Sequence, residues 1–147
     1  MDKRQMDTAL WMGELEAILQ MGKDVPLNIT GNSMAPFLRH DRDQVLLRTC
    51  TAPIRRGDIL LYKRPNGQYI LHRVVKVKRD HLWMAGDAQH ILEQVSPDWV
   101  IARAVKARRN GKWLTPKSPV WQFYRHLWRL TLPFRNTLRQ LHIRLHK

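Results

Sequence analysis

Short apolar runs separated by turn residues fill residues 25–115, and this alternation restricts the possible fold more than any other feature of the chain. The runs are rich in Val, Ile and Leu, and Gly, Pro, Asn and Asp stand between them, a pattern typical of β-strands joined by tight turns. The sequence therefore predicts a mainly β fold, a compact coiled sheet. We expect strands at residues 27–30, 44–48, 59–62, 69–78, 80–85, 99–108 and 112–114.

Two Asn-Gly pairs mark turns between the predicted strands. Asn66-Gly67 follows Pro65, and Asn110-Gly111 precedes the last strand. Asn and Gly tolerate the positive φ angles of a two-residue hairpin turn, so we expect tight turns at both places.

Helical patterns flank the sheet region. Apolar residues at helical spacing predict an N-terminal helix over residues 4–22 that packs on the sheet. Its expected buried stripe is Met6, Ala9, Leu10, Gly13, Ile18 and Met21. The alternative is a shallow membrane contact through Leu10, Trp11, Leu15 and Leu19. Residues 120–145 predict a second helical segment, interrupted at Pro133, with a stripe of Trp121, Tyr124, Leu127, Trp128 and Leu132. We therefore expect an N-terminal helix (1–24), a β domain (25–115) and a basic helical tail (116–147).

The net charge of +14 is concentrated at the C-terminal end. Residues 1–102 contain 14 Lys or Arg and 12 Asp or Glu, whereas residues 103–147 contain 12 Lys or Arg and no acid. Such a tail attracts phosphate, either in lipid headgroups or in nucleic acid. It can lie in a membrane interface with its apolar stripe among acyl chains, or pack on the β domain with a solvated basic face, and the sequence supports both equally.

No stretch approaches the roughly 20 apolar residues that span a bilayer, and the N-terminus carries no secretory signal. We therefore expect peripheral association with an anionic membrane surface through residues 118–147, on a side that the sequence does not specify. Cys50 is the only cysteine, and the histidines show no ligand spacing, so the sequence predicts neither a metal site nor a cofactor.

Ser33 lies in the turn Thr30-Gly31-Asn32-Ser33-Met34-Ala35-Pro36, directly after a predicted strand. A serine hydroxyl becomes a nucleophile when a base takes its proton, and a tight turn would hold the hydroxyl outward. The backbone N–H groups of Ser33 and Met34, or the Asn32 amide, are candidate oxyanion donors. On its own the stretch is better explained as an ordinary turn, because Gly, Asn and Ser are common turn residues.

Two later stretches contain possible partners for Ser33. His72 shares a strand face with Ile70 and Val74, where a neutral imidazole would act as a general base. Asp87 follows Gly86 at the end of a strand, and Glu93 lies shortly after it. Either carboxylate could orient His72. Each residue also has a common structural explanation, as a core histidine or a turn acid.

Read together, these stretches resemble the signal-peptidase superfamily of serine peptidases, which also includes the self-cleaving repressors. The resemblance covers about residues 28–105. Its motifs lie at 31–36 (Gly-Asn-Ser-Met-Ala-Pro), 56–62 (Arg-Gly-Asp-Ile-Leu-Leu-Tyr), 70–75 (Ile-Leu-His-Arg-Val-Val), 86–88 (Gly-Asp-Ala) and 100–105 (Val-Ile-Ala-Arg-Ala-Val).

The resemblance implies that Ser33 is the nucleophile and that His72 occupies the position of the base. This is similar to the archaeal and endoplasmic-reticulum type, whereas bacterial leader peptidases and the repressors use lysine. Asp87 corresponds to the Gly-Asp aspartate of the family, and a second family aspartate falls near Glu93, which is longer by one methylene. Both remain candidates for the acid. Typical members also carry a transmembrane helix before the serine, whereas residues 1–24 here contain many charged residues.

The function we expect is a serine endopeptidase that removes a signal or leader segment from a secreted or modified peptide. The family implies a substrate bound as an added strand, with small side chains near the cut. One alternative is a nucleic-acid-binding regulator of the repressor type, which the basic tail favours and the absence of a helix-turn-helix pattern opposes. The other is a family member that binds peptides without cutting them.

Overall fold

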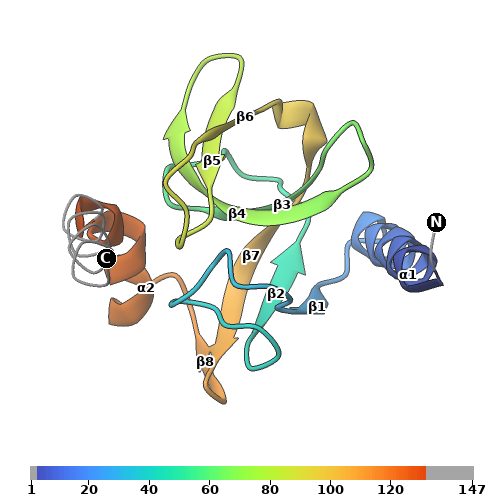
Figure 1. The fold of residues 1–147 in the computed structure, drawn as a ribbon, viewed down its shortest axis with the longest axis horizontal. Coiled ribbons are helices and arrows are strands. Elements are labelled where there is room, and N and C mark those ends of the chain that lie inside the picture. Colours follow the sequence, from blue (N-terminus) through green and yellow to red (C-terminus); the bar gives the residue numbers. More distant parts are fainter. Residues whose placement is uncertain (1–2, 132–147) are drawn as a thin grey trace, which may run out of the picture.

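A computed structural model of the chain describes residues 3–131, and the fold is mainly β, as the sequence predicts (Figure 1). The strands are β1 (Val25–Asn28), β2 (Gln44–Arg48), β3 (Ile59–Lys63), β4 (Tyr69–Val77), β5 (Leu82–Ala85), β6 (Glu93–Val95), β7 (Val100–Arg109) and β8 (Lys112–Leu114). The helices are α1 (Lys3–Gln20) and α2 (Pro119–His126), with short 3₁₀ segments η1 (Pro97–Trp99) and η2 (Trp128–Thr131).

All pairings in the sheet are antiparallel, and the strand order is β1-β2-β7-β3-β4-β5-β6, with β8 paired to β7. Register shifts interrupt the pairs β2–β7, β3–β7 and β4–β5. Such irregularities increase the local twist of a sheet. As a result β4, β5 and β6 curl over the top of the molecule in Figure 1, while α1 and α2 lie at opposite sides. The predicted coiled sheet is confirmed.

The two Asn-Gly turns differ in conformation. Asn110 and Gly111 both have positive φ angles, 50° and 82°, so the turn between β7 and β8 is the predicted two-residue type. Between β3 and β4 only Gly67 has a positive φ angle, and the N–H of Arg64 donates to the carbonyl of Gln68. The turn between β3 and β4 is therefore longer than the predicted two-residue type, because Pro65 and Asn66 do not have positive φ angles.

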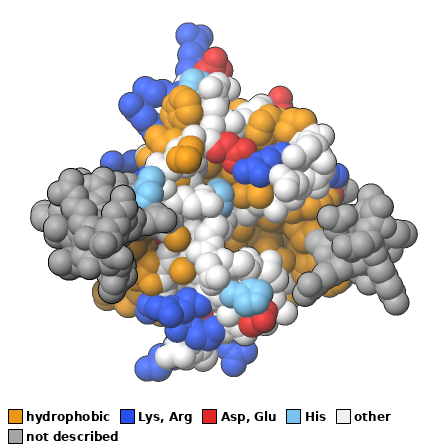
Figure 2. All heavy atoms as spheres, in the orientation of Figure 1, with side chains coloured by type: hydrophobic (Ala, Val, Ile, Leu, Met, Phe, Trp, Pro, Cys, Tyr) orange, Lys and Arg blue, Asp and Glu red, His pale blue; other side chains and the backbone are white. Residues whose placement is uncertain are grey.

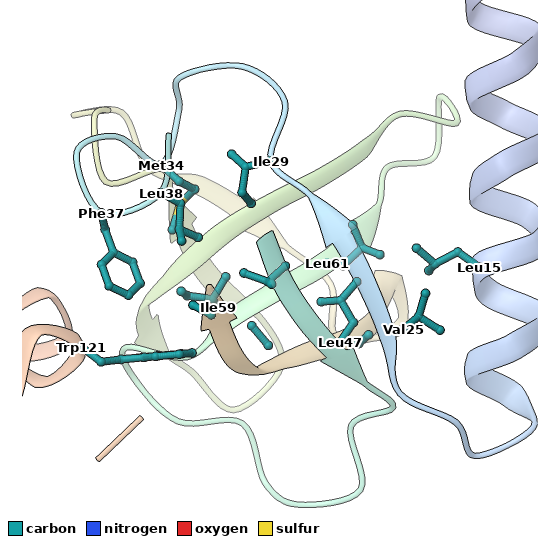
Figure 3. Close-up of a cluster of buried hydrophobic side chains, with 14 of the residues drawn as sticks. Leu15, Val25, Ile29, Met34, Phe37, Leu38, Leu47, Ile59, Leu61 and Trp121 are labelled. Carbon is teal, nitrogen blue, oxygen red and sulfur yellow. The ribbon is translucent and has the colours of Figure 1, made fainter. Parts of the chain in front are cut away.

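The larger hydrophobic core joins the sheet to both helices (Figure 3). Leu15 of α1 and Trp121 of α2 enter this core from opposite sides and are almost fully buried. A smaller core lies on the other face of β3 and β4, formed by Leu60, Tyr62, Val74, Leu82, Met84 and Val95. Because Leu60 pairs with His72 across these strands, the imidazole lies on the side of the smaller core.

In residues 11–21, the buried side chains are not those that the apolar spacing suggests; the side chains of Met6, Ala9 and Leu10, also in the expected stripe, lie outside the described ones. Met12, Leu15 and Leu19 pack on the sheet, whereas Ile18 and Met21 are 39 % and 69 % exposed. Trp11 is also exposed. Apolar residues therefore surround the described part of this helix, and their periodicity does not single out one face. Leu15 and Leu19, two of the four residues of the alternative membrane contact, are buried against the sheet, whereas Trp11 is exposed and the side chain of Leu10 lies outside the described ones.

The described part of the C-terminal tail packs on the β domain. Trp121 and Tyr124 are buried, as a packed helix requires, but Leu127 of the same expected stripe is 50 % exposed. Trp128 of that stripe, in η2, packs partly buried against the same core. The α-helix ends at His126, and within 119–131 the expected stripe holds except at Leu127. Leu132 and Pro133 lie outside the described residues. Within residues 3–131, no helix has both the length and the apolar character needed to cross a bilayer.

Candidate active site

The turn that carries Ser33 is held by buried apolar side chains on either side of it. Ile29 precedes the turn, and Met34, Phe37 and Leu38 follow Ser33; all four side chains are at most 4 % exposed. Gly31 has a φ angle of 78°, which a residue with a Cβ rarely adopts. Burial of its neighbours therefore fixes the backbone of Ser33 while its own side chain stays partly exposed.

The turn at Gly86 packs directly against the backbone of Ser33. The N–H of Ala88 donates to the carbonyl of Ser33 at 2.9 Å. A Cβ added at Gly86 would collide with that same carbonyl oxygen and would lie 3.0 Å from the Cβ of Ser33. Only glycine fits there, so the structure brings two of the motifs singled out in the sequence into contact.

Asp87 forms a buried ion pair with Arg73. The Nε and Nη2 atoms of Arg73 donate to the two carboxylate oxygens at 2.7 and 2.9 Å, and both side chains are at most 1 % exposed. Arg73 also donates to the carbonyl of Gly57, and the indole of Trp128 donates to the backbone carbonyl of Asp87. These bonds hold the Gly86–Asp87–Ala88 turn in place against Ser33.

His72 is 6 % exposed and is connected to Glu93 through a tyrosine that the sequence analysis did not select. Its Nδ1 atom lies 3.4 Å from the hydroxyl of Tyr62, and that hydroxyl donates to Glu93 at 2.5 Å. Arg64 donates to both oxygens of Glu93, at 2.7 and 2.8 Å. Of the two candidate acids, Glu93 therefore reaches His72 through one intervening hydroxyl, whereas Asp87 binds Arg73.

The surroundings of His72 favour its neutral form. Burial, with a smaller contribution from Arg64, lowers the pKa of His72 to about 4, and the attraction of Glu93 offsets only part of this. Hydrogen bonds from Arg64 keep the pKa of Glu93 below its ordinary value. Burial, together with the bond to Glu93, raises the pKa of Tyr62. At neutral pH the three groups are thus an uncharged imidazole, a carboxylate and an un-ionised phenol.

Ser33 and His72 line the same cleft, which has a volume of about 240 Å³. Its other walls come from α1, the end of β1, the turn that carries Ser33, β3 and the start of β4, namely Met12, Leu27, Asn28, Ile29, Thr30, Gly31, Met34, Leu61, Tyr69, Ile70 and Leu71. None of these residues is charged. We refer to this as the serine cleft.

His72 also lines a second cleft of about 440 Å³, together with Arg64, Met84, Ala88, Gln89, His90, Ile91 and Glu93. Histidine, acidic and basic side chains lie near the centre of the face shown in Figure 2, between the two helices. His72 therefore separates an uncharged cleft from a charged one. A larger cleft of about 590 Å³ lies beside α1, but it contains none of the candidate catalytic residues.

The expected oxyanion donors differ in their positions. The Asn32 side chain is exposed, whereas the side chain of Met34 is buried and contributes only its backbone N–H. Among the described residues, the N–H groups of Ser33 and Met34 have no hydrogen-bond acceptor. Both lie in the turn that contains the hydroxyl of Ser33.

The described residues contain no group of three His, Cys, Asp or Glu side chains that could hold a metal ion. No family model matches the chain, and no curated protein matches it either. The likeness to signal peptidases therefore remains an inference from the motifs.

Proposed function

We propose that this protein is a serine endopeptidase that cleaves a signal or leader segment from a secreted or modified peptide, with Ser33 as nucleophile and His72 as general base. The observation that carries the proposal is that both side chains line one uncharged cleft, with the Gly86 turn packed on the backbone of Ser33. A buried neutral imidazole can accept a proton at neutral pH, which is the first requirement of a base.

The reaction runs in two halves. The proton of the Ser33 hydroxyl moves to Nε2 of His72 while the oxygen attacks the scissile carbonyl, and the N–H groups of Ser33 and Met34 donate to the developing oxyanion. The peptide C–N bond then breaks, and His72 returns the proton to the leaving amine. Water, activated by His72, hydrolyses the acyl ester and restores the hydroxyl.

The shape of the sheet supports an extended substrate. β4 pairs with β5 only from Arg73 onward, so among the described strands residues 69–72 have a strand neighbour only on the β3 side. Tyr69, Ile70 and Leu71 line the serine cleft. A substrate strand added along this edge would place its carbonyl groups beside Ser33 and its side chains in an uncharged cleft.

Labelling and cleavage test the proposal together. We expect a serine-directed phosphonate probe to label Ser33, and a library of unstructured peptides to be cut, as followed by mass spectrometry. Both should be lost in Ser33→Ala, cleavage should be lost in His72→Ala, and Ser118→Ala, outside both clefts, should behave as the wild type. Labelling that survives in Ser33→Ala would contradict the proposal. Peptide binding without cleavage in the wild type would instead favour the non-catalytic alternative.

We further propose that the enzyme associates peripherally with an anionic membrane. Exposed apolar side chains occur along α2, at the residue after it and in η2, namely Val120, Phe123, Leu127 and Leu130. No acid occurs in residues 103–147, so this segment suits lipid phosphates. We expect flotation with vesicles containing phosphatidylserine, weakened in Phe123→Ser/Leu127→Ser and unchanged in the control Ile91→Ser. A DNA mobility shift without flotation would support the nucleic-acid alternative.

A further inference from the structure

Tyr62 lies between the two groups that the proposed reaction connects, the base and its acid. It belongs to β3, where it pairs with Ile70 of β4, and its side chain is fully buried in the smaller core. Its hydroxyl contacts Nδ1 of His72 on one side and Oε1 of Glu93 on the other. A buried phenol that contacts both groups can decide which protons they hold.

A phenol has a single proton, and the geometry assigns it to Glu93. The distance from the Tyr62 hydroxyl to Glu93 is 2.5 Å, whereas the distance to His72 is 3.4 Å. Glu93 is ionised beside Arg64, so it accepts this bond and has no proton to offer. The oxygen of Tyr62 is then left with lone pairs towards the imidazole.

The contact with His72 therefore requires a proton on the imidazole. Two acceptors facing each other would repel, so Nδ1 must carry its hydrogen and donate to Tyr62. A neutral imidazole holds only one proton, which leaves Nε2 unprotonated. This is the nitrogen that the proposed reaction uses.

We propose that Tyr62 is a positioning residue that fixes the tautomer of His72, holding the proton on Nδ1 and leaving Nε2 as the base for Ser33. The role rests on the proposed function, since it matters only if His72 accepts the serine proton. Glu93 acts through Tyr62. The hydroxyl that donates to the carboxylate is polarised, so its oxygen is a stronger acceptor for Nδ1–H when the imidazole becomes positively charged.

The charges around the imidazole are consistent with this arrangement. Arg64, Glu93 and His90 line the charged cleft on one side of His72, and none of the described residues that line the serine cleft on the other side is charged. Within the part of the chain that the structure describes, Glu93 is the only carboxylate that lines either cleft. Stabilisation of the imidazolium therefore comes from the side of Tyr62.

Tyr62→Phe and Glu93→Gln test whether Tyr62 fixes the tautomer of His72. Tyr124→Phe is the control, because it also removes a phenol hydroxyl but lies outside both clefts. Imidazole ¹⁵N shifts measure the tautomer without any turnover. We expect wild type and Tyr124→Phe to show Nδ1 protonated and Nε2 unprotonated in His72, and Tyr62→Phe to show a mixture of tautomers. Folding of each variant is checked by circular dichroism.

Peptide cleavage gives the second measurement. We expect Tyr62→Phe to lower kcat by about 10- to 100-fold with little change in KM, a part of the roughly 10²–10⁴-fold that a general base contributes. Glu93→Gln should lower kcat while Tyr62 remains, because the charge is lost. If wild-type His72 carries its proton on Nε2, or if Tyr62→Phe leaves both tautomer and kcat unchanged, the role of Tyr62 is refuted. Failure of Ser33→Ala to abolish cleavage would refute the proposed function instead.

Discussion

Burial of a neutral His72 should make the stability of this protein depend on pH between the ordinary and the lowered pKa of its imidazole. In the unfolded chain the imidazole has an ordinary pKa of 6.5, and in the folded protein burial lowers it to about 4. Between pH 6.5 and pH 4 the imidazole is mostly protonated in the unfolded chain and mostly neutral in the folded protein. The free energy of unfolding must therefore fall as the pH falls from 6.5 towards 4.

The size of the effect follows from the two pKa values. They differ by about 2.5, and each pH unit of difference corresponds to about 1.4 kcal/mol, so the full loss is about 3 kcal/mol. Between pH 7.5 and pH 4.5 most of this range is crossed, and we expect a loss of about 2.5 kcal/mol from His72. Above about pH 7.5 the imidazole is almost entirely neutral in both states and contributes almost no pH dependence.

Urea unfolding at pH 7.5, 6.0 and 4.5 measures this contribution when wild type is compared with His72→Gln. The variant lacks the titrating group, so its stability should decline by about 2.5 kcal/mol less than that of wild type over the same range. His90→Gln, which removes an exposed histidine from the charged cleft, should follow the wild type. Parallel curves for wild type and His72→Gln would show that His72 is not held neutral and would refute the reasoning.

Four further predictions concern the same site and its supports. The kcat/KM for peptide cleavage should stay level down to about pH 5 and fall near pH 4, because it reports the base of the free enzyme; an acid limb near 6.5 would contradict the pKa of His72. Gly86→Ala should destabilise by about 1–3 kcal/mol in urea unfolding and reduce labelling of Ser33, since the methyl group displaces the serine backbone. Asp87→Asn should cost about 3–5 kcal/mol by leaving the charge of Arg73 buried without its carboxylate. Trp121→Ala should cost a similar amount, about 3–5 kcal/mol, by opening a cavity between α2 and the sheet, whereas Leu130→Ser should change the stability by less than about 0.5 kcal/mol.

The strands were predictable because each is a short apolar run with turn residues at its ends. β2 and β8 agree with their predicted limits, and the others differ by a few residues. β6 was missed because it has only three residues, Glu93–Val95, two of them polar. Such a strand exists through its pairing with β5, which local sequence does not reveal.

The helix faces were less predictable for a different reason. The described part of α1 has apolar residues around its circumference, so the buried face depends on where the helix meets the sheet. In the C-terminal segment the sequence shows one apolar stripe, of which Trp121, Tyr124 and Trp128 pack on the core while Leu127, just after the end of α2, is exposed. The spacing of apolar residues does not tell which of them are buried, because this depends on how the helix packs on the sheet.

The site shows the same limit of local reasoning. Ser33, His72 and Asp87 could be picked out because each lies in a recognisable motif. Tyr62 ends another of the motifs, at 56–62. Its contacts with His72 and Glu93 depend on the pairing of β3 with β4 and on the position of β6 beside β5. The sequence did contain one indication of the contact. Residues 59–62 and 69–78 are adjacent predicted strands, and the alternation of side chains along them allows Tyr62 and His72 to face the same side of the sheet.

The two acids that the sequence left open make separate contacts and differ in burial. Asp87 is fully buried, and both of its oxygens are bonded to Arg73, so its charge is neutralised where it holds the turn behind Ser33. Glu93 is about one-quarter exposed and shares its charge between Arg64 and the hydroxyl of Tyr62. A carboxylate that is only partly neutralised and lies one hydroxyl away from the base is suited to stabilise a transient imidazolium. In the proposed mechanism the charge of Glu93, which contacts the Tyr62 hydroxyl from β6, would act on His72 through that hydroxyl.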